Sequence, residues 1–501
     1  MNTVAKKIGI FGFFTLTGSM ILTVYSYPVL ASSGFSLVFF LLIAALFYFI
    51  PAALVSAELA TTNTLEIGGV YKWCSVAFTK RWGFFAIFLQ WAQITVGFLA
   101  MLYFIVGSIS YVIDIPSLNT NSYYKFLSVM LIFWLLTLIN FKGAKFSAKI
   151  ASIGVIAGVV IPIVTMVILL ILYVINANPI HVSFKASAFF PDFMNIHALT
   201  IFVTFILAYA GIEASAVHVN NMVNPQRNYP TAIVLLSIFA ISVAIIGSLS
   251  IAIVIPNTDI NMSSGVVQTF EVLLKHYHLK WLTPVFALLL AIGALAEVSS
   301  WIVGPSEGIL VAAEEQLLPK WFAATNKHDV PVNLIITQAI VVTIWAFIIT
   351  LGGGGSNLSF MIAMALAVLI YLTMYVLLFL AYFIIKYKYA NKARGFIVPG
   401  GRIGRNLIPI IGLLTVIFAI IISFFPPIQI ENNNSYEYEL ILSISFICVL
   451  LVPNLIYSTY SLRKDKQKQI TRYQLQNLDY QHHHKWIHLR GRKPFCIQHK
   501  E

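Results

Sequence analysis

Apolar stretches of about 20 residues recur along the whole chain, separated by short polar segments. A run of this length spans a bilayer as an α-helix, which satisfies all of its backbone polar groups internally. Turn-forming residues mark several breaks, such as 176–179, 352–355 and Pro426-Pro427. The pattern predicts an all-α polytopic membrane protein with about twelve transmembrane helices. The expected spans are 8–30, 35–57, 82–113, 123–141, 147–175, 198–219, 230–256, 279–312, 331–351, 357–386, 405–426 and 438–460.

The composition fits a surface that faces lipid. Of the 501 residues, 59% are hydrophobic and 10% are charged, whereas soluble domains carry about 25% charged residues. The first apolar run is too long for a removable signal peptide, and a second follows at once. The cysteines Cys74, Cys448 and Cys496 are scattered, so we expect no metal site and no disulfide framework. The sequence has no nucleotide-binding glycine loop and no Ser-His-Asp arrangement, so we expect neither an enzyme nor a cofactor.

The basic residues are distributed very unevenly. With the N-terminus in the cytoplasm, 27 of the 31 Lys and Arg residues fall on the cytoplasmic side. This imbalance predicts a multi-pass protein of the bacterial inner membrane with both termini cytoplasmic. The net charge of +13 therefore follows mainly from the topology of a membrane protein, and we expect no nucleic-acid partner. We expect a transporter domain over 1–460 and a basic cytoplasmic tail over 461–501. The four residues on the outer side are Lys125, Lys185, Lys275 and Lys280.

Two carboxylates fall well inside predicted spans, where ionisable groups are costly and usually functional. They are Glu213 in the sixth span and Glu297 in the eighth. Glu58 and Glu307 lie near helix ends, where we expect solvated, interfacial positions.

Glycines in the first and sixth spans suggest interrupted helices. Gly211 lies in the segment 209–215 beside Glu213, and Gly18-Ser19 lies in the segment 16–20 of the first span. Matched interruptions in two five-helix halves indicate a transporter site, whose free N–H groups suit a substrate carboxylate. The alternative is that both glycines only allow close helix packing.

Aromatic residues continue this pattern on two helices. Glu297 and Trp301 are four residues apart, as are Tyr371 and Tyr375, so each pair shares a helix face. An aromatic face beside a carboxylate suits an amine. Membrane Tyr and Trp residues also form interfacial belts, but these four fall in or near the middle of their spans.

Short motifs along nearly the whole chain carry a family resemblance. The chain resembles the amino acid–polyamine–organocation superfamily, and more closely the bacterial glutamate/GABA antiporter family of acid resistance. The motifs are Phe11-Gly12-Phe13-Phe14, Ser19-Met20, Val24-Tyr25, Tyr27-Pro28, 34–42, Phe190-Pro191-Asp192-Phe193, 211–216, Asn224-Pro225, 300–306, Ile370-Tyr371-Leu372 and Val398-Pro399-Gly400-Gly401.

The resemblance implies a LeuT-type architecture with two inverted five-helix repeats and two extra helices. It also implies that glutamate enters while GABA leaves, so that a cytoplasmic glutamate decarboxylase can consume protons. On the family pattern, the positions that line the transport path are Tyr25, Glu213, Glu297, Trp301, Tyr371 and Tyr375. The family also has a C-terminal plug that closes the cytoplasmic mouth near neutral pH.

The tail after Tyr460 has the composition that such a plug needs. Histidine ordinarily titrates near pH 6.5, so acid would add charge to a segment that is already basic, and repulsion from the cytoplasmic loops could expel it. The alternatives are a disordered basic tail attracted to anionic lipid or a weak metal-binding tract. The candidate pH-gating residues are His482, His483, His484, His488, Arg490 and Arg492.

Two residues depart from the family pattern. Ser26 stands between Tyr25 and Tyr27, where the family commonly has a carboxylate, and Glu307 stands where a basic residue is common. The substrate range and the activation pH therefore stay open. The alternatives to exchange are a proton-coupled glutamate importer and a non-transporting nutrient sensor.

Overall fold

The computed structural model describes residues 9–460, except 64, 66–68, 353–355 and 428–434. Twelve helices in this part are long and apolar enough to cross a membrane, which confirms the predicted all-α polytopic fold. Their bounds are Ile10–Ala31, Ser36–Ala60, Lys80–Val112, Ser122–Asn140, Lys149–Ile175, Ala198–Ala216, Pro225–Val254, Lys280–Glu314, Val332–Leu351, Leu358–Lys388, Gly401–Ile422 and Ser435–Tyr460.

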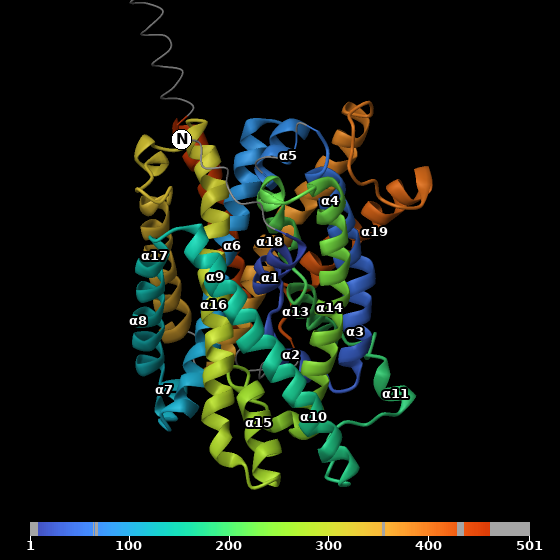
Figure 1. Cartoon of the computed structure of the whole chain (residues 1–501), viewed down its shortest axis with the longest axis vertical. Helices are drawn as coiled ribbons and strands as arrows, with labels where there is room; N and C mark the ends of the chain where they lie inside the picture. The colour runs from blue at the N-terminus through green and yellow to red at the C-terminus, as the bar shows by residue number, and fades with distance from the viewer. Residues whose placement is uncertain (1–8, 64, 66–68, 353–355, 428–434, 461–501) are drawn as a thin grey trace, which may run out of the picture.

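Helix α6 (Lys80–Val112) runs through the interior of the bundle beside two other long helices (Figure 1). It packs against both α16 (Thr283–Glu314) and α18 (Ser356–Lys388). The third span, which α6 forms, is 94% buried over its most apolar window. A helix that is apolar on all sides is stable when other helices surround it completely, which is the position of α6.

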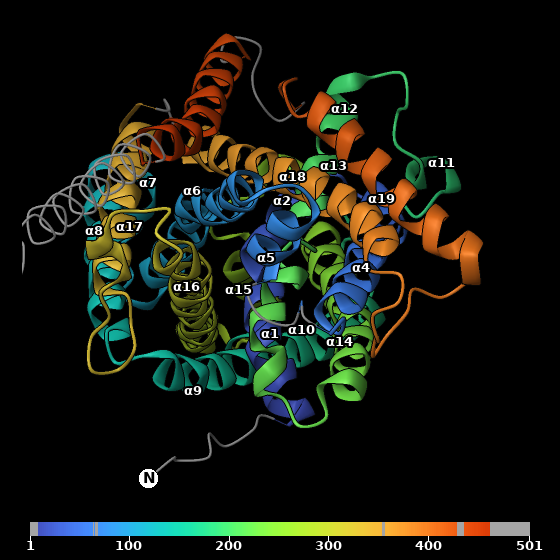
Figure 2. The same ribbon diagram turned by 90° about the horizontal axis from the view of Figure 1, so that it is seen from above.

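The outer helices turn apolar residues toward the surroundings. On α8 (Ser122–Asn140), Leu127, Leu131 and Leu135 are at least half exposed and form a stripe at intervals of four residues. Such a stripe would be unfavourable in water and is matched by the hydrocarbon of a bilayer. Viewed from above, α19 (Gly401–Ile422) and the last span likewise lie at the edge of the bundle (Figure 2).

Two of the spans contain a short π-helix that ends two residues before a proline. The second span consists of α3 (Ser36–Ala44), η2 (Ala45–Phe49) and α4 (Ile50–Ala60), with Pro51 at the start of α4. The proline ring has no N–H and clashes with the carbonyl four residues earlier, so the wider π-turn relieves the helix there. The same arrangement in the fifth span comprises α9 (Ala144–Val155), η3 (Ile156–Val160) and α10 (Ile161–Ile175).

The fifth and eighth spans cross in close contact through glycines. A Cβ added at Gly158 in η3 would lie 2.2 Å from Cα of Gly293 in α16. Small residues of this kind let two membrane helices approach backbone to backbone. This crossing forms one wall of the site described below.

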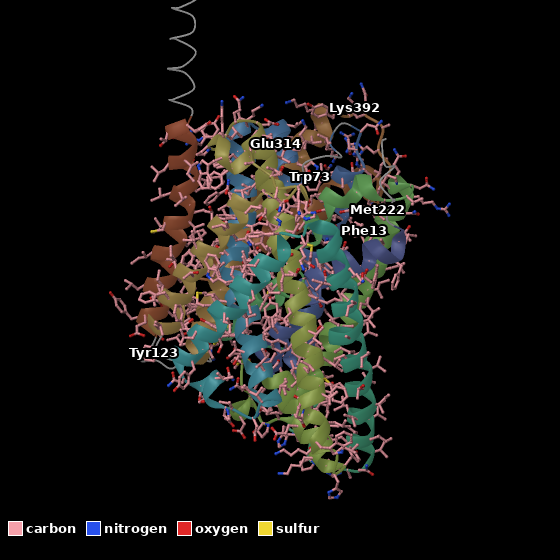
Figure 3. All side chains as sticks on the ribbon, turned by 60° about the vertical axis from the view of Figure 1, so that its left-hand side comes forward. Phe13, Trp73, Tyr123, Met222, Glu314 and Lys392 are labelled. Carbon is pink, nitrogen blue, oxygen red and sulfur yellow. The ribbon has the colours of Figure 1, made fainter. Side chains whose placement is uncertain are left out.

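The remaining elements connect the spans or complete them at the ends of the bundle. Lys392 and Glu314 lie at one end and Tyr123 lies toward the other (Figure 3). Lys80 Nζ at the start of α6 lies 2.5 Å from Glu315 Oε2 just after α16, so these two helix ends share the first side. The other elements are α5 (Gly69–Ala77), α7 (Ser117–Thr120), α11 (Ala186–Phe189), α14 (Pro225–Val254), η5 (Asn257–Asp259), α15 (Gly265–His276), η6 (Lys280–Leu282), η7 (Lys320–Ala323), α17 (Val332–Ala346) and η8 (Phe347–Leu351).

Candidate functional site

The sixth span is interrupted at Gly211, within the segment where a break was predicted. Helices α12 (Ile196–Thr200) and α13 (Phe202–Leu207) lead into a turn, and the 3-10 helix η4 (Ile212–Asn221) continues the span. Gly211 has a φ of 111°, in the left-handed region that glycine adopts without steric cost. A Cβ at Gly211 would also lie 3.0 Å from the ring of Trp301, so the glycine permits both the turn and this contact.

The first span is also interrupted, but after the predicted segment. Helix α1 (Ile10–Ile21) still includes Gly18 and Ser19, because Gly18 O accepts a hydrogen bond of 2.9 Å from Leu22 N. The expectation that Gly18-Ser19 itself is unwound is therefore wrong. The helix ends at Ile21, with Leu22 as its C-cap, and η1 (Val24–Ser26) and α2 (Tyr27–Ala31) follow.

Side-chain hydrogen bonds explain the position of this break. Ser26 Oγ donates to Thr23 O at 2.7 Å, and the Thr23 and Ser26 hydroxyls lie 3.1 Å apart. Such local bonds offer the backbone an alternative to the helical pattern. Pro28, which has no N–H, sits near the start of the next helical segment, where its missing donor costs least. Hydroxyl residues and a proline, rather than Gly18, thus determine where the helix stops.

The first-span break lines a small internal cavity. Its walls include Ser19 and Tyr25 of the first span, Gly158 of η3 and Glu297 of α16. The cavity volume is about 10 Å³, close to the minimum that holds one water molecule. In this closed arrangement the cavity has no room for a molecule larger than water.

Glu297 is the carboxylate of this cavity. Its side chain is buried, and its Oε1 has no hydrogen-bond partner among the described residues. Ser19 Oγ, on the same cavity, lies 3.0 Å from Ser300 Oγ, one turn along α16 from Glu297. A buried carboxylate oxygen without a donor is unfavourable, and an ammonium group or a proton would satisfy it.

Trp301 connects the two interrupted spans. Its Nε1 donates to Met20 O at 3.1 Å, near the end of α1. Its ring lies against Gly211, as described above. The indole of Trp301, on α16, therefore contacts a residue at or next to each of the two breaks.

Glu213 forms a second group together with three donors. Gln90 Nε2 lies 2.8 Å and the Tyr371 hydroxyl 2.5 Å from Oε1, and the Tyr375 hydroxyl bonds Oε2. Gly211 N in turn donates to the Tyr375 hydroxyl at 3.3 Å. All three partners donate, so the carboxylate acts only as an acceptor. This cluster, which we call the Glu213 cluster, ties the sixth-span break to α6 and α18.

The cavity and the Glu213 cluster lie at different depths in the bundle. Phe104 of α6 lines the cavity, whereas Gln90 of the same helix belongs to the cluster. Their separation of 14 positions corresponds to about 21 Å along the helix axis. The Glu213 cluster is closer to the end of α6 that carries Lys80.

Residues 8–451 match the family model described as amino acid permease. The chain belongs to the amino acid permease family. A glutamate/gamma-aminobutyrate antiporter of Lactococcus lactis subsp. lactis is 48% identical over 460 residues, which cover 91% of this permease and 92% of the relative. A protein of the same description from L. lactis subsp. cremoris is 48% identical over 91% of each chain. An uncharacterized transporter of Legionella pneumophila is 34% identical, covering 90% and 97%.

The residues predicted from the sequence thus fall into two groups in the permease. Ser19, Tyr25 and Glu297 line the cavity, with Gly18 adjacent in α1. Glu213, Tyr371 and Tyr375 form the cluster, whereas Gly211 and Trp301 lie at the breaks.

Sequence reasoning missed three contributors to these groups. They are Gln90, Ser300 and the backbone carbonyl of Met20. An amide inside a long apolar helix is a signal that could have identified Gln90, because such groups seek partners across helices. No local signal identifies the Met20 carbonyl, since its partner Trp301 is 281 positions away.

The expectation that Glu58 is solvated is wrong. Its side chain is fully buried at the end of α4 and accepts hydrogen bonds from Arg394 and, at 2.6 Å, from Arg405. Tyr382 OH and Val398 N each donate to its Oε2 at 2.9 Å. The segment that follows α18 folds over the end of α4 and excludes water from this carboxylate. We call these residues the Glu58 cluster.

The two departures from the family pattern have different environments. Ser26 is fully buried and takes part in the hydrogen bonds that end α1, as described above. Glu307, in the second half of α16, is half-buried.

The candidate pH-gating residues of the tail lie outside the described residues, because the description ends at residue 460. Among the residues that are described, no group of three His, Cys, Asp or Glu side chains could hold a metal ion.

Proposed function

We propose that this permease exchanges external glutamate for internal GABA by alternating access. The two L. lactis relatives support this proposal, since both are described as glutamate/gamma-aminobutyrate antiporters and align over about nine-tenths of the chain. The structural observation that carries it is a buried cavity at an interrupted span, with a Glu297 oxygen in its wall that has no hydrogen-bond partner in the described part of the chain. Interrupted helices at the centre of a membrane protein are a known means of binding small charged substrates.

The chemistry of the two substrates fits one shared site. Both carry an amine and a carboxylate, and glutamate has one carboxylate more than GABA. In our proposal the amine faces Glu297, Tyr25 and the backbone carbonyls of the first-span break. The carboxylate lies against the backbone N–H groups of the two breaks. The protonation states of Glu213 and Glu297 then determine which net charge of the substrate the site accepts.

The Glu213 cluster is proposed as the barrier between the cavity and the cytoplasm. It lies on the Lys80 side of the cavity, because its residue Gln90 precedes the cavity residue Phe104 along α6. Opening requires Tyr371 and Tyr375, which α18 carries, to release Glu213. The bundle with spans 1 and 6 would rock against the scaffold that holds α6 and α18. This movement must offset the free energy that is lost when the three hydrogen bonds to the Glu213 carboxylate break.

We further propose the location and the regulation of this exchange. The chain lies in the bacterial inner membrane with both termini cytoplasmic, as the distribution of basic residues predicts. The tail over 461–501 acts as a plug that protonation of its histidines releases. Exchange would then supply a cytoplasmic glutamate decarboxylase and contribute to acid resistance.

Substitutions in the two groups test this proposal. Glu213→Ala and Trp301→Ala should abolish glutamate uptake in proteoliposomes preloaded with GABA, while the protein stays in the membrane at normal levels. Leu131→Ala, on the lipid-facing stripe of α8, is the matched control and should leave uptake intact. Unchanged uptake in the first two variants would refute these assignments.

A further inference from the structure

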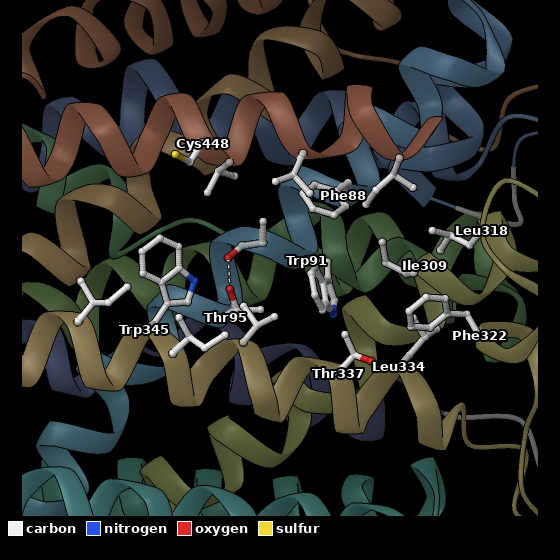
Figure 4. A pocket seen from close by; sticks show the side chains of 17 residues that line it. Phe88, Trp91, Thr95, Ile309, Leu318, Phe322, Leu334, Thr337, Trp345 and Cys448 are labelled. Carbon is white, nitrogen blue, oxygen red and sulfur yellow. Dashed lines mark hydrogen bonds between the residues drawn. The ribbon is translucent and has the colours of Figure 1, made fainter. Parts of the chain in front are cut away.

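A large apolar pocket lies apart from both groups of the candidate site. Its volume is about 370 Å³, and it opens between α6, α16, α17 and the last span (Figure 4). Phe88 and Trp91 of α6 and Leu334 of α17 line it, and Cys448 of the last span lies on its other side. The last span is therefore separated from α6, α16 and α17 along the length of the pocket and does not pack directly against them there.

The pocket is lined mainly by apolar side chains, and the polar atoms of Trp91 and Thr95 are bonded elsewhere. Trp91 Nε1 donates to Gln338 Oε1 at 3.0 Å, and Thr95 Oγ1 donates to Ala92 O at 2.7 Å, the bond dashed in Figure 4. Ile344 and Val452 are 53% and 40% exposed, so the pocket communicates with the lipid-facing surface. An apolar cavity of this kind excludes water and accepts a hydrocarbon chain.

Two basic residues lie at the Lys80 end of this pocket. Arg81 is seven residues before Phe88 and so shares its face of α6, and its guanidinium donates to Asn454 Oδ1 at 3.0 Å. Asn454 lies between the lining residues Val452 and Ile456. Lys320 is two residues before the lining residue Phe322. Arg81 and Lys320 are both exposed, and among the described ion pairs neither is bound to a carboxylate.

We propose that this pocket is a binding site for one anionic phospholipid. An acyl chain fills the space between the last span and α6, and the phosphate lies between Arg81 and Lys320. Basic residues at the end of an interhelical pocket are a recognised way of holding anionic headgroups. A neutral lipid would satisfy only the apolar part of the site.

The pocket wall is directly connected to the Glu213 cluster. Trp91 follows Gln90, which donates to Glu213, and Gln338 bonds both Trp91 and Ser306 of α16. A chain held against Trp91 would therefore fix the segment of α6 that carries the Gln90 amide. Lipid occupancy should raise the stability of the closed state described here.

Lipid retention measured by native mass spectrometry tests the site independently of transport. The full-length protein would be purified in detergent and supplied with phosphatidylglycerol or phosphatidylcholine. Wild type should retain one phosphatidylglycerol in preference to phosphatidylcholine. Arg81→Gln and Lys320→Gln should each weaken this retention about fivefold, from about 1 kcal/mol per basic residue. Lys327→Gln, an exposed lysine beyond the pocket lining, is the control and should retain the lipid as wild type does.

A second variant tests the apolar part of the pocket. Ala92→Phe should fill the space beside Trp91 and abolish retention of the lipid, whereas Leu131→Phe on the exposed face of α8 should not. Equal retention of the two lipids by wild type would overturn the proposal, as would undiminished retention in both charge variants. A dimer that buries this pocket, detected by light scattering, would also overturn it. Because the charge substitutions are on the surface, they test the proposal even if Ala92→Phe does not fold.

Discussion

Replacing Glu58 by glutamine should destabilise this permease by about 3–5 kcal/mol, the usual cost of removing one partner of a buried ion pair. The Glu58 side chain is 0% exposed and that of Arg394 4%, so water cannot replace the lost charge. Each carboxylate oxygen accepts two hydrogen bonds, from Arg394 and Arg405 at Oε1 and from Tyr382 and Val398 N at Oε2. An amide has one acceptor oxygen, so in either orientation its NH₂ would face two donors.

Unfolding by urea in detergent micelles, followed by far-ultraviolet circular dichroism, measures this effect. Glu315→Gln is the matched control at the same end of the bundle. Its partner Lys80 is 64% exposed, and surface ion pairs of this kind contribute about 0–1 kcal/mol. The expected order of stability is therefore wild type, then Glu315→Gln close to it, then Glu58→Gln well below.

A double substitution separates the ion pair from simple loss of packing. Arg394→Gln combined with Glu58→Gln should cost less than the sum of the two single changes, because the second change removes the uncompensated charge. Glu58→Gln within about 1 kcal/mol of wild type would refute the reasoning. Strict additivity of the two changes would refute it as well.

Three further predictions concern the site and its surroundings. Gly211→Ala should cost about 1–3 kcal/mol and impair uptake, because alanine is strained at a φ of 111°. Gly352→Ala, with no atom of the described residues within 4 Å of its Cβ, should be tolerated in the same assays. Gln90→Leu removes one of three donors to Glu213 and should slow uptake. Gln93→Leu removes an amide whose Oε1 has no partner among the residues that the structure describes, and it should leave uptake unchanged. Partial burial raises the pKa of Glu315, but the hydrogen bond from Lys80 and its charge outweigh this effect, so the net pKa is lowered. The stability difference between wild type and Glu315→Gln should therefore be present above about pH 4.3 and vanish as the pH falls further, as urea titrations at several pH values would show.

Features that depend on local sequence could be predicted. The twelve spans follow from apolar length, and the sixth-span break follows from a glycine in a segment of small residues. The first-span break could not be located by the same rule. Gly18 stays helical, and the hydroxyls of Thr23 and Ser26 stop the helix instead. Glycine only permits a break, whereas competing hydrogen bonds determine its position.

Features that depend on distant contacts could not be predicted. The partners of Glu58 lie more than 300 positions away in the sequence, so its place at a helix end suggested solvation. The division of the candidate residues into a cavity and a separate cluster also follows from packing, because Gln90 joins Glu213 only once α6 lies beside the sixth span. The candidate site residues could be chosen from the sequence, but which of them lie together in the structure could not be predicted.

Exchange in proteoliposomes tests the central proposal most directly. Radiolabelled glutamate would be supplied outside at pH 5.5 and at pH 7.5 to vesicles that are empty or loaded with GABA, about one unit either side of the ordinary histidine pKa. The full chain would be compared with one that ends after Lys468, which lacks all the candidate gating histidines and arginines. The account predicts uptake only with GABA inside, low at the higher pH and restored there by the truncation. Uptake into empty vesicles driven by a proton gradient would contradict exchange and indicate an importer.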